Sequence, residues 1–110
     1  MGTYSIINPK AVNPANAVGL TPLHAAATGG YLQVCNAILE KLRNHPNLLN
    51  PEDEDGETPL HYAAEKGHAD VCEAILKVAL VKNPANDVGR TPLHIAADAG
   101  HEKICKMIMY

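Results

Sequence analysis

The tetrapeptide Thr-Pro-Leu-His occupies residues 21–24, 58–61 and 91–94 of this 110-residue chain. The second copy starts 37 residues after the first, and the third starts 33 residues after the second. Flanking residues recur at constant offsets: a glycine two positions upstream, an alanine pair downstream, then a glycine and a cysteine. Because chance does not place so many identical residues in register, we predict three internal repeats.

Each tetrapeptide is predicted to begin a short helix. The threonine side chain can accept a hydrogen bond from a free N–H of the first turn. Proline is favoured at the first helical position, where its missing N–H would have no partner anyway. The glycines at 30, 67 and 100 suit the left-handed conformation that ends many helices.

A second helix is predicted after each of these glycines. In every unit the apolar residues recur with the i, i+1, i+4, i+5 spacing of one buried helical face. They are Val34, Cys35, Ile38, Leu39 and Leu42 in the first unit; Val71, Cys72, Ile75, Leu76, Ala79 and Leu80 in the second; and Ile104, Cys105, Ile108 and Met109 in the third.

Polar turns separate the units. The segments 16–19, 53–56 and 86–89 begin with Asn or Asp and end with Gly, which is the composition of a β-turn. Each unit is therefore predicted to be a turn, a helix, a loop and a second helix. No unit of this size can bury its apolar face alone, so the units must stack.

This pattern resembles the ankyrin repeat family over nearly the whole chain. The resemblance implies an all-α solenoid of helix–turn–helix units joined by β-turn or hairpin loops. We expect a single domain over residues 1–110, divided into 1–15 as a remnant of a preceding repeat or a lead-in, 16–52 as repeat 1, 53–85 as repeat 2 and 86–110 as a truncated repeat 3. Repeat 1 departs from the pattern by Tyr31, where the others have histidine, and by four extra residues within 41–49. The extra residues predict a longer second helix or a longer loop.

Both ends of the chain lack the polar outer face of a capping repeat. The segment 4–10 looks like the end of an earlier repeat, and Tyr110 aligns with Lys77, within the second helix of repeat 2. We therefore expect a fragment of a longer array, and end-to-end stacking of molecules through the uncapped repeats.

Composition excludes several classes of protein. The net charge of −3 opposes binding to nucleic acid, which needs a basic surface. No apolar run is long enough to span a membrane, and no signal peptide is evident. Three widely spaced cysteines indicate free thiols in a reducing compartment, so we expect an intracellular protein of the cytoplasm or nucleus.

No residue pattern predicts catalysis. The histidines 24, 61 and 94 could form a metal or proton ladder, but their identical placement favours a structural role, in which each ties its helix to the neighbouring turn. The pairs His68–Cys72 and His101–Cys105 have helical spacing but lack further zinc ligands. Serine-hydrolase, phosphate-loop and dinucleotide motifs are missing from the sequence. We therefore expect no enzyme activity, no cofactor and no metal.

The family resemblance implies that partners contact the turn tips and the exposed face of the first helix of each repeat. Carried over to this chain, these positions are Ala17, Val18, Leu20, Thr28 and Gly29 in repeat 1; Glu54, Asp55, Glu57, Glu65 and Lys66 in repeat 2; and Asp87, Val88, Arg90, Asp98 and Ala99 in repeat 3. The function that follows is a non-catalytic scaffold that binds another protein. A structural spacer or elastic segment of a larger protein is the alternative.

Two features of these tips have both a functional and a structural interpretation. The acidic run from Glu52 to Glu57 is either a dock for a basic segment or a solvated turn. The apolar residues Val18, Leu20 and Val88 are either anchors for a partner or isolated exposed side chains.

The asparagines 13, 50 and 83 match the residue that some ankyrin repeats present for β-hydroxylation. The structural interpretation, which we favour, is that each asparagine braces its own turn through bonds to the backbone.

Overall fold

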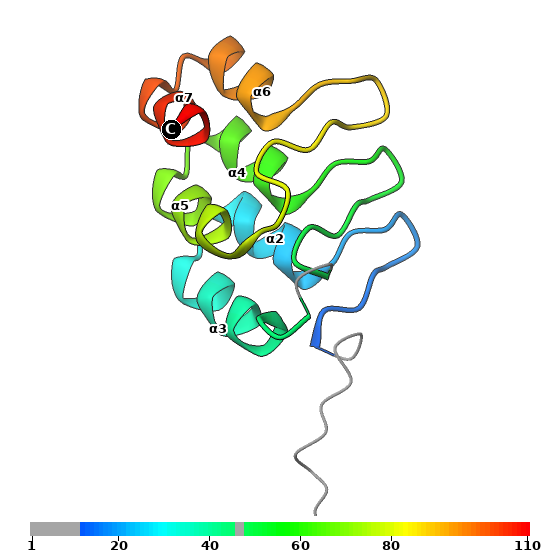
Figure 1. The fold of residues 1–110 in the computed structure, drawn as a ribbon. Coiled ribbons are helices and arrows are strands. Elements are labelled where there is room, and N and C mark those ends of the chain that lie inside the picture. Colours follow the sequence, from blue (N-terminus) through cyan, green and yellow to red (C-terminus); the bar gives the residue numbers. More distant parts are fainter. Residues whose placement is uncertain (1–11, 46–47) are drawn as a thin grey trace, which may run out of the picture.

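The computed structural model describes residues 12–45 and 48–110, and within them the chain forms a stack of three helix pairs (Figure 1). The first helices of the pairs are α2 (Pro22–Gly29), α4 (Pro59–Lys66) and α6 (Pro92–Ala99). The second helices are α3 (Leu32–Leu42), α5 (Ala69–Val78) and α7 (Glu102–Met109). The predicted all-α stack is confirmed, and the described residues contain no strand.

The predicted ends of the first helices are confirmed. In α4 the Thr58 side chain accepts a hydrogen bond from the backbone N–H of His61, and the His61 ring accepts one from the backbone N–H of Thr58. This reciprocal cap, which recurs in α2 and α6, satisfies two backbone donors at once. Each of the three helices ends at a glycine with a left-handed backbone, such as Gly67 with a φ of 79°.

The second helices bury most of the predicted apolar stripe. Cys35, Ile38, Leu39 and Leu42 of α3 are buried, as are Val71, Cys72 and Ile75 of α5. Three residues that we predicted to be buried are exposed: Val34 (49%), Leu80 (69%) and Met109 (55%). Val34 and Met109 belong to the first and last repeats, where no further described repeat covers them. Leu80 follows the end of α5, where the chain has become extended at Ala79 and the helical spacing no longer applies.

The alanine pairs allow the first helices to pack closely. Ala26, Ala27, Ala63 and Ala64 are all buried, and α2 packs on α4, which packs on α6. Their small side chains bring each backbone near the next, while the leucines of the first two tetrapeptides fill the space between helices. Leu23 and Leu60 are both fully buried.

The extra residues of the first repeat lie mainly in the loop after α3. This helix has 11 residues, one more than α5, and successive turns then join His45 to Leu42 and Leu48 to His45. Leu49 is 1% exposed and belongs to the core, so the longer loop contributes an additional apolar side chain.

The turns between units form hairpin loops that project to one side of the stack (Figure 1). In each loop the glycine N–H donates to the carbonyl of the Asn or Asp three residues earlier, as in Gly56 to Asp53 at 2.9 Å. The loops also bond to one another: Glu54 N donates to the Val18 carbonyl, and Asp87 N to the Asp55 carbonyl, both at 3.0 Å. The predicted β-turns are confirmed, and the projecting loops form a continuous edge. The expected repeat remnant at 1–15 lies mostly outside the described residues.

Candidate functional site

His24 and His61, in the first two tetrapeptides, fix the hairpin loops that follow them relative to the helices. His24 Nε2 lies 2.8 Å from the carbonyl oxygen of Glu57, and His61 Nε2 lies 3.0 Å from that of Arg90. Each ring therefore caps its own helix through Nδ1 and holds the following hairpin through Nε2. This is the structural role that the sequence favoured.

A buried polar cluster braces the central hairpin. The Asp53 carboxylate accepts hydrogen bonds from the Tyr62 hydroxyl at 2.5 Å and from the backbone N–H groups of Asp55 and Glu57, both at 2.9 Å. Burial by itself raises the pKa of Asp53, but these hydrogen bonds outweigh it and the net pKa is lowered. Burial, and then the bond to Asp53, raise the pKa of Tyr62 well above its usual value. Near neutral pH the Asp53 carboxylate therefore stays ionised and the Tyr62 hydroxyl stays protonated, so the hydrogen bond between them is kept.

Asp53 corrects one part of the acidic-tip prediction. This residue is only 9% exposed, so it faces its own loop and not a partner. Glu57 is half-buried and accepts a hydrogen bond from Asn86 Nδ2 at 3.0 Å. The freely exposed carboxylates of the run are Glu52, Glu54 and Asp55.

On the hairpins and first helices, most positions that differ between repeats are accessible. In the middle repeat the shared Thr, Pro, Leu, His and alanine pair are buried, together with Gly56. The predicted contact positions are exposed, apart from the half-buried Glu57. The other two repeats also expose these positions, except for Leu20 and Thr28, which are half-buried. Among the large apolar side chains of the tips, Val88 is the most exposed, at 80%.

One accessible position escaped the sequence prediction. It follows the histidine of each tetrapeptide and holds Ala25, Tyr62 or Ile95. These residues lie on the first helices beside the predicted ones and line hollows on this surface. The signal was present in the sequence, since this position changes from repeat to repeat while both its neighbours stay constant.

Two shallow hollows lie on the face formed by the hairpins and first helices. The first is mainly apolar and includes Leu20, Pro22, Ala25, Thr28 and Tyr62. The second lies between α4 and α6 and is lined by Glu57, Glu65, Arg90, Ile95, Asp98 and Ala99. The face therefore offers an apolar recess beside an acidic one.

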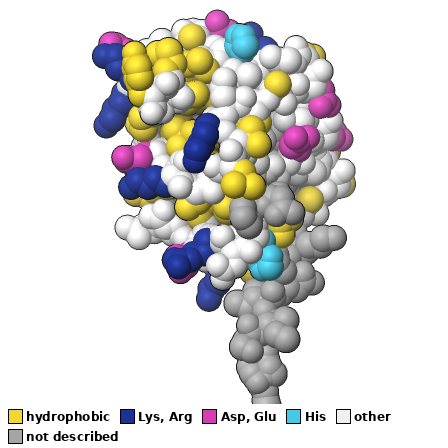
Figure 2. Space-filling view, in the orientation of Figure 1, with side chains coloured by type: hydrophobic (Ala, Val, Ile, Leu, Met, Phe, Trp, Pro, Cys, Tyr) yellow, Lys and Arg dark blue, Asp and Glu magenta, His cyan; other side chains and the backbone are white. Residues whose placement is uncertain are grey.

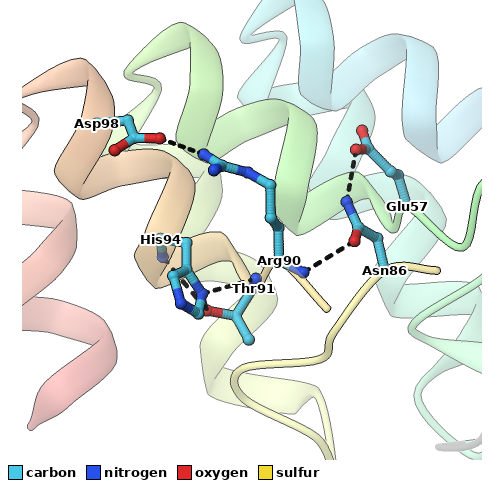
Figure 3. A network of polar contacts seen from close by, with 6 residues as sticks. All are labelled: Glu57, Asn86, Arg90, Thr91, His94 and Asp98. Atoms are coloured by element: carbon cyan, nitrogen blue, oxygen red, sulfur yellow. Dashed lines mark hydrogen bonds and ion pairs between the residues drawn. The ribbon is translucent and has the colours of Figure 1, made fainter. Parts of the chain in front are cut away.

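A polar network borders the second hollow (Figure 3). The Arg90 side chain extends along α6 to Asp98, and its guanidinium donates a hydrogen bond to that carboxylate. The same bond, and then the positive charge of Arg90, lower the pKa of Asp98. The Arg90 backbone N–H donates to Asn86 Oδ1 at 2.9 Å, and Asn86 in turn bonds Glu57. Arg90 is thus partly neutralised by its partner, which leaves Glu57 and Glu65 as uncompensated carboxylates.

Charge is segregated between the two sides of the stack. Among the described residues, the hairpins and first helices hold Glu54, Asp55, Glu57, Glu65, Asp87 and Asp98 against only Lys66 and Arg90. The second helices and their ends carry a mixed set that includes Lys41, Arg43, Lys77, Lys103 and Lys106. In Figure 2 the side chains at the left, over the second helices, are basic with some acidic ones among them, whereas those at the right, toward the hairpins, are acidic.

The asparagines make the backbone bonds that the structural interpretation required, but over a longer reach. Asn13 Oδ1 accepts from Leu23 N at 2.8 Å, and Asn83 Oδ1 accepts from Leu93 N at 3.1 Å. Asn50 differs: its amide nitrogen donates to the Val81 carbonyl at 2.9 Å. Each thus braces a segment beyond its own turn.

The cysteines, and the histidines that precede the second helices, lie in positions that indicate structural roles. Cys35 and Cys72 are fully buried free thiols, and burial raises their pKa values to about 11 and about 12. His68 Nε2 bonds the Thr28 carbonyl at 3.0 Å. No group of three metal-binding side chains occurs within residues 12–45 and 48–110. In the same residues, no helix has the length and apolar character needed to cross a bilayer.

The fold and this surface define a helical repeat protein with an open, variable face. A family model for three copies of the ankyrin repeat matches residues 3–79 and 42–110. The chain belongs to the ankyrin repeat family. Ankyrin repeats are generally protein–protein interaction modules and are typically non-catalytic. A search of curated proteins gives no match.

Proposed function

We propose that this chain is a non-catalytic scaffold module that binds a basic, extended segment of another protein. The binding surface comprises the hairpin tips and the exposed face of α2, α4 and α6. One observation carries the proposal: the predicted contact positions, which differ between repeats, are mostly exposed, whereas the shared tetrapeptide, the alanine pair and Gly56 are buried in the middle repeat. Residues that no packing constrains are free to encode a partner.

The charge of this surface supports a basic partner. Glu54, Asp55, Glu57 and Glu65 carry negative charge on the hairpins and on α4, against the basic residues Lys66 and Arg90, of which Arg90 is paired with Asp98. Opposite charge on a partner would speed its encounter and help to fix its orientation. The same charge opposes the phosphates of a nucleic acid.

The hollows support a partner with one apolar residue near its basic ones. Leu20, Ala25 and Tyr62 border the apolar recess, and Glu65 and Ile95 border the acidic one. Packed helices lie about 8–10 Å apart, and an extended chain rises about 3.3 Å per residue. A segment lying across α2, α4 and α6 would therefore place its apolar and basic residues about three positions apart.

Three free cysteines support an intracellular location, because thiols persist in reducing compartments. The family supports the interaction role, since ankyrin repeats generally bind proteins.

An array of short synthetic peptides of varied composition, probed with the labelled chain, tests the proposal. We expect the chain to select peptides that carry Lys or Arg about three positions from an apolar residue, and salt to weaken their binding. A variant with Glu54→Lys, Asp55→Lys and Glu65→Lys should lose these peptides.

The matched control carries Glu40→Lys, Glu73→Lys and Glu102→Lys, which make the same change in net charge on the second helices. In the native chain Glu40 pairs with Arg43, and Glu102 pairs with Lys106. Both ion pairs are exposed, so losing them costs little stability. The control should bind like the native chain. Equal loss in both variants would reduce the effect to overall charge and contradict the proposed surface.

A further inference from the structure

The last repeat exposes side chains whose equivalents are buried in the first two. Leu23 and Leu60 are 0% exposed, but Leu93 is only half-buried; Ala27 and Ala64 are 0% exposed, but Ala97 is exposed. Cys105 and Ile108 are half-buried, whereas Cys72 and Ile75 are fully buried. These residues of α6 and α7 form the open face of repeat 3, which faces away from repeat 2.

The polar groups of this open face also lack the partners that their equivalents have. His24 and His61 bond the next hairpin through Nε2, but His94 Nε2 has no such bond within the described part of the chain. The Val18 and Asp55 carbonyls accept from the next loop. The equivalent Val88 carbonyl accepts no bond of this kind from residues 12–45 or 48–110.

Two glycines of the last repeat lack the close neighbour that their equivalents have among the described residues. A Cβ added to Gly56 would meet Asp87 of the next hairpin at 2.4 Å, and one added to Gly67 would meet the His101 ring at 2.7 Å. A Cβ added at Gly89 or Gly100 would meet nothing within 4 Å. The open face of repeat 3 therefore has the shape and bonding groups that repeats 1 and 2 use to hold the repeat after them.

The first repeat exposes the complementary half of this interface. Pro59 and Pro92 are fully buried, yet Pro22 is exposed; Val71 and Ile104 are at most 1% exposed, yet Val34 is 49% exposed. The Leu20 carbonyl occupies the position of the Glu57 and Arg90 carbonyls that accept from histidine. Within residues 12–45 and 48–110, the chain thus holds both halves, without a partner, of a contact that it makes twice internally.

We propose that a second copy of this chain stacks head-to-tail, with its repeat 1 on the open face of repeat 3. In this contact His94 Nε2 donates to the Leu20 carbonyl of the second copy, and the Ala17 N–H of that copy donates to the Val88 carbonyl. Val34 of the second copy covers α7 of the first copy, just as the equivalent residue Val71 lies in the core between α3 and α5. Tyr31 takes the place of the histidines at 68 and 101 and lies over Gly100.

The contact joins two different faces, so it does not close on itself and builds open stacks. Two open faces of repeat 3 cannot pair in its place, because both offer a His94 donor to the same position and neither offers the hairpin carbonyl that accepts it. The hairpin edge continues through the contact, which lengthens the variable face without covering it.

Sedimentation velocity over a wide range of concentration tests the proposal. We expect the mean mass of the native chain to rise with concentration through dimers to longer stacks. Ala97→Arg blocks the open face of repeat 3, and Val34→Arg blocks the face of repeat 1. Each variant alone should remain monomeric, because one of its two faces is lost.

An equimolar mixture of these two variants gives the decisive measurement. Each retains one competent face, so the mixture should form one-to-one dimers and nothing larger, which also shows that both variants fold. Val81→Arg, at an exposed position between repeats 2 and 3 and away from both end faces, should stack like the native chain. A native chain that stays monomeric at every concentration, or a mixture that forms no dimer, would overturn the proposal.

Discussion

His61 of one repeat holds the hairpin of the next: its Nε2 lies 3.0 Å from the carbonyl oxygen of Arg90, 29 residues further along the chain. The other ring nitrogen accepts a hydrogen bond from Thr58 N at 3.0 Å. The ring is fully buried, so both nitrogens are engaged away from water. A single side chain thus begins a helix and joins two repeats.

Replacing His61 by alanine should therefore destabilise the stack strongly. The change leaves the Thr58 N–H without its partner and removes a bond to the Arg90 carbonyl, and each buried polar group left unsatisfied costs about 1–3 kcal/mol. We expect a loss of about 2–4 kcal/mol. His94→Ala, at an exposed ring, should cost about 1 kcal/mol. Urea unfolding of both variants measures the difference, and equal losses would contradict the inter-repeat role.

A pair of glycines separates backbone strain from steric contact. Gly67 and Gly100 have φ values of 79° and 78°, so alanine is strained equally at both, by about 1–2 kcal/mol. Only at Gly67 would the new Cβ approach the His101 ring, at 2.7 Å. We expect Gly67→Ala to lower the free energy of unfolding by at least about 1 kcal/mol more than Gly100→Ala. Matching losses would show that the His101 ring moves aside freely.

The repeated residues were enough to predict the fold, because their roles are local or recur in every unit. Thr58 as a cap, Pro59 at the first helical position and Gly67 at the helix end each follow from backbone chemistry alone. The stack then follows from apolar stripes that no single unit can bury. The exposure of Val34 and Met109 was missed because both share the pattern of buried equivalents and differ only in lying on a terminal repeat.

The candidate surface was predicted from the family resemblance, and two of its details depended on contacts distant in sequence. Asp53 appeared to be one more charge of an acidic run until the structure placed it beside the Tyr62 hydroxyl. Glu57 is held by Asn86, 29 residues away, which no local pattern indicates. Tyr62 itself was overlooked because it is not among the positions that the family resemblance supplied.

Acidic pH should weaken the fold through His24. Burial lowers the pKa of this histidine below 6.5, although the Glu57 carbonyl and the Asp53 charge oppose the shift. The unfolded chain then takes up a proton at a higher pH than the folded chain does, so stability rises with pH in this range. Stability should fall as the pH drops below about 6.5, until the folded pKa is also passed.

Urea unfolding at a series of pH values between neutral and mildly acidic measures this dependence. His24→Gln is the matched variant, since glutamine at the third helical position can still bond back to the cap. The variant should be less stable at neutral pH and should show a shallower fall on acidification. An unchanged slope would assign the pH dependence to other groups.

The three cysteines should differ widely in reactivity although they occupy equivalent positions. Cys35 and Cys72 are fully buried, and burial raises their thiol pKa values to about 11 and about 12, so few thiolates form. Cys105 is only half-buried because no described repeat covers α7. In dilute native protein at mildly alkaline pH, iodoacetamide should therefore modify Cys105 first. Intact mass and peptide mapping would show one fast adduct, with the other two appearing only as the stack unfolds.

Cys105→Ser should abolish the fast adduct, and denaturant should make all three thiols react alike. If Cys72 reacts as fast as Cys105 in the native chain, then repeat 2 opens far more readily than its burial implies.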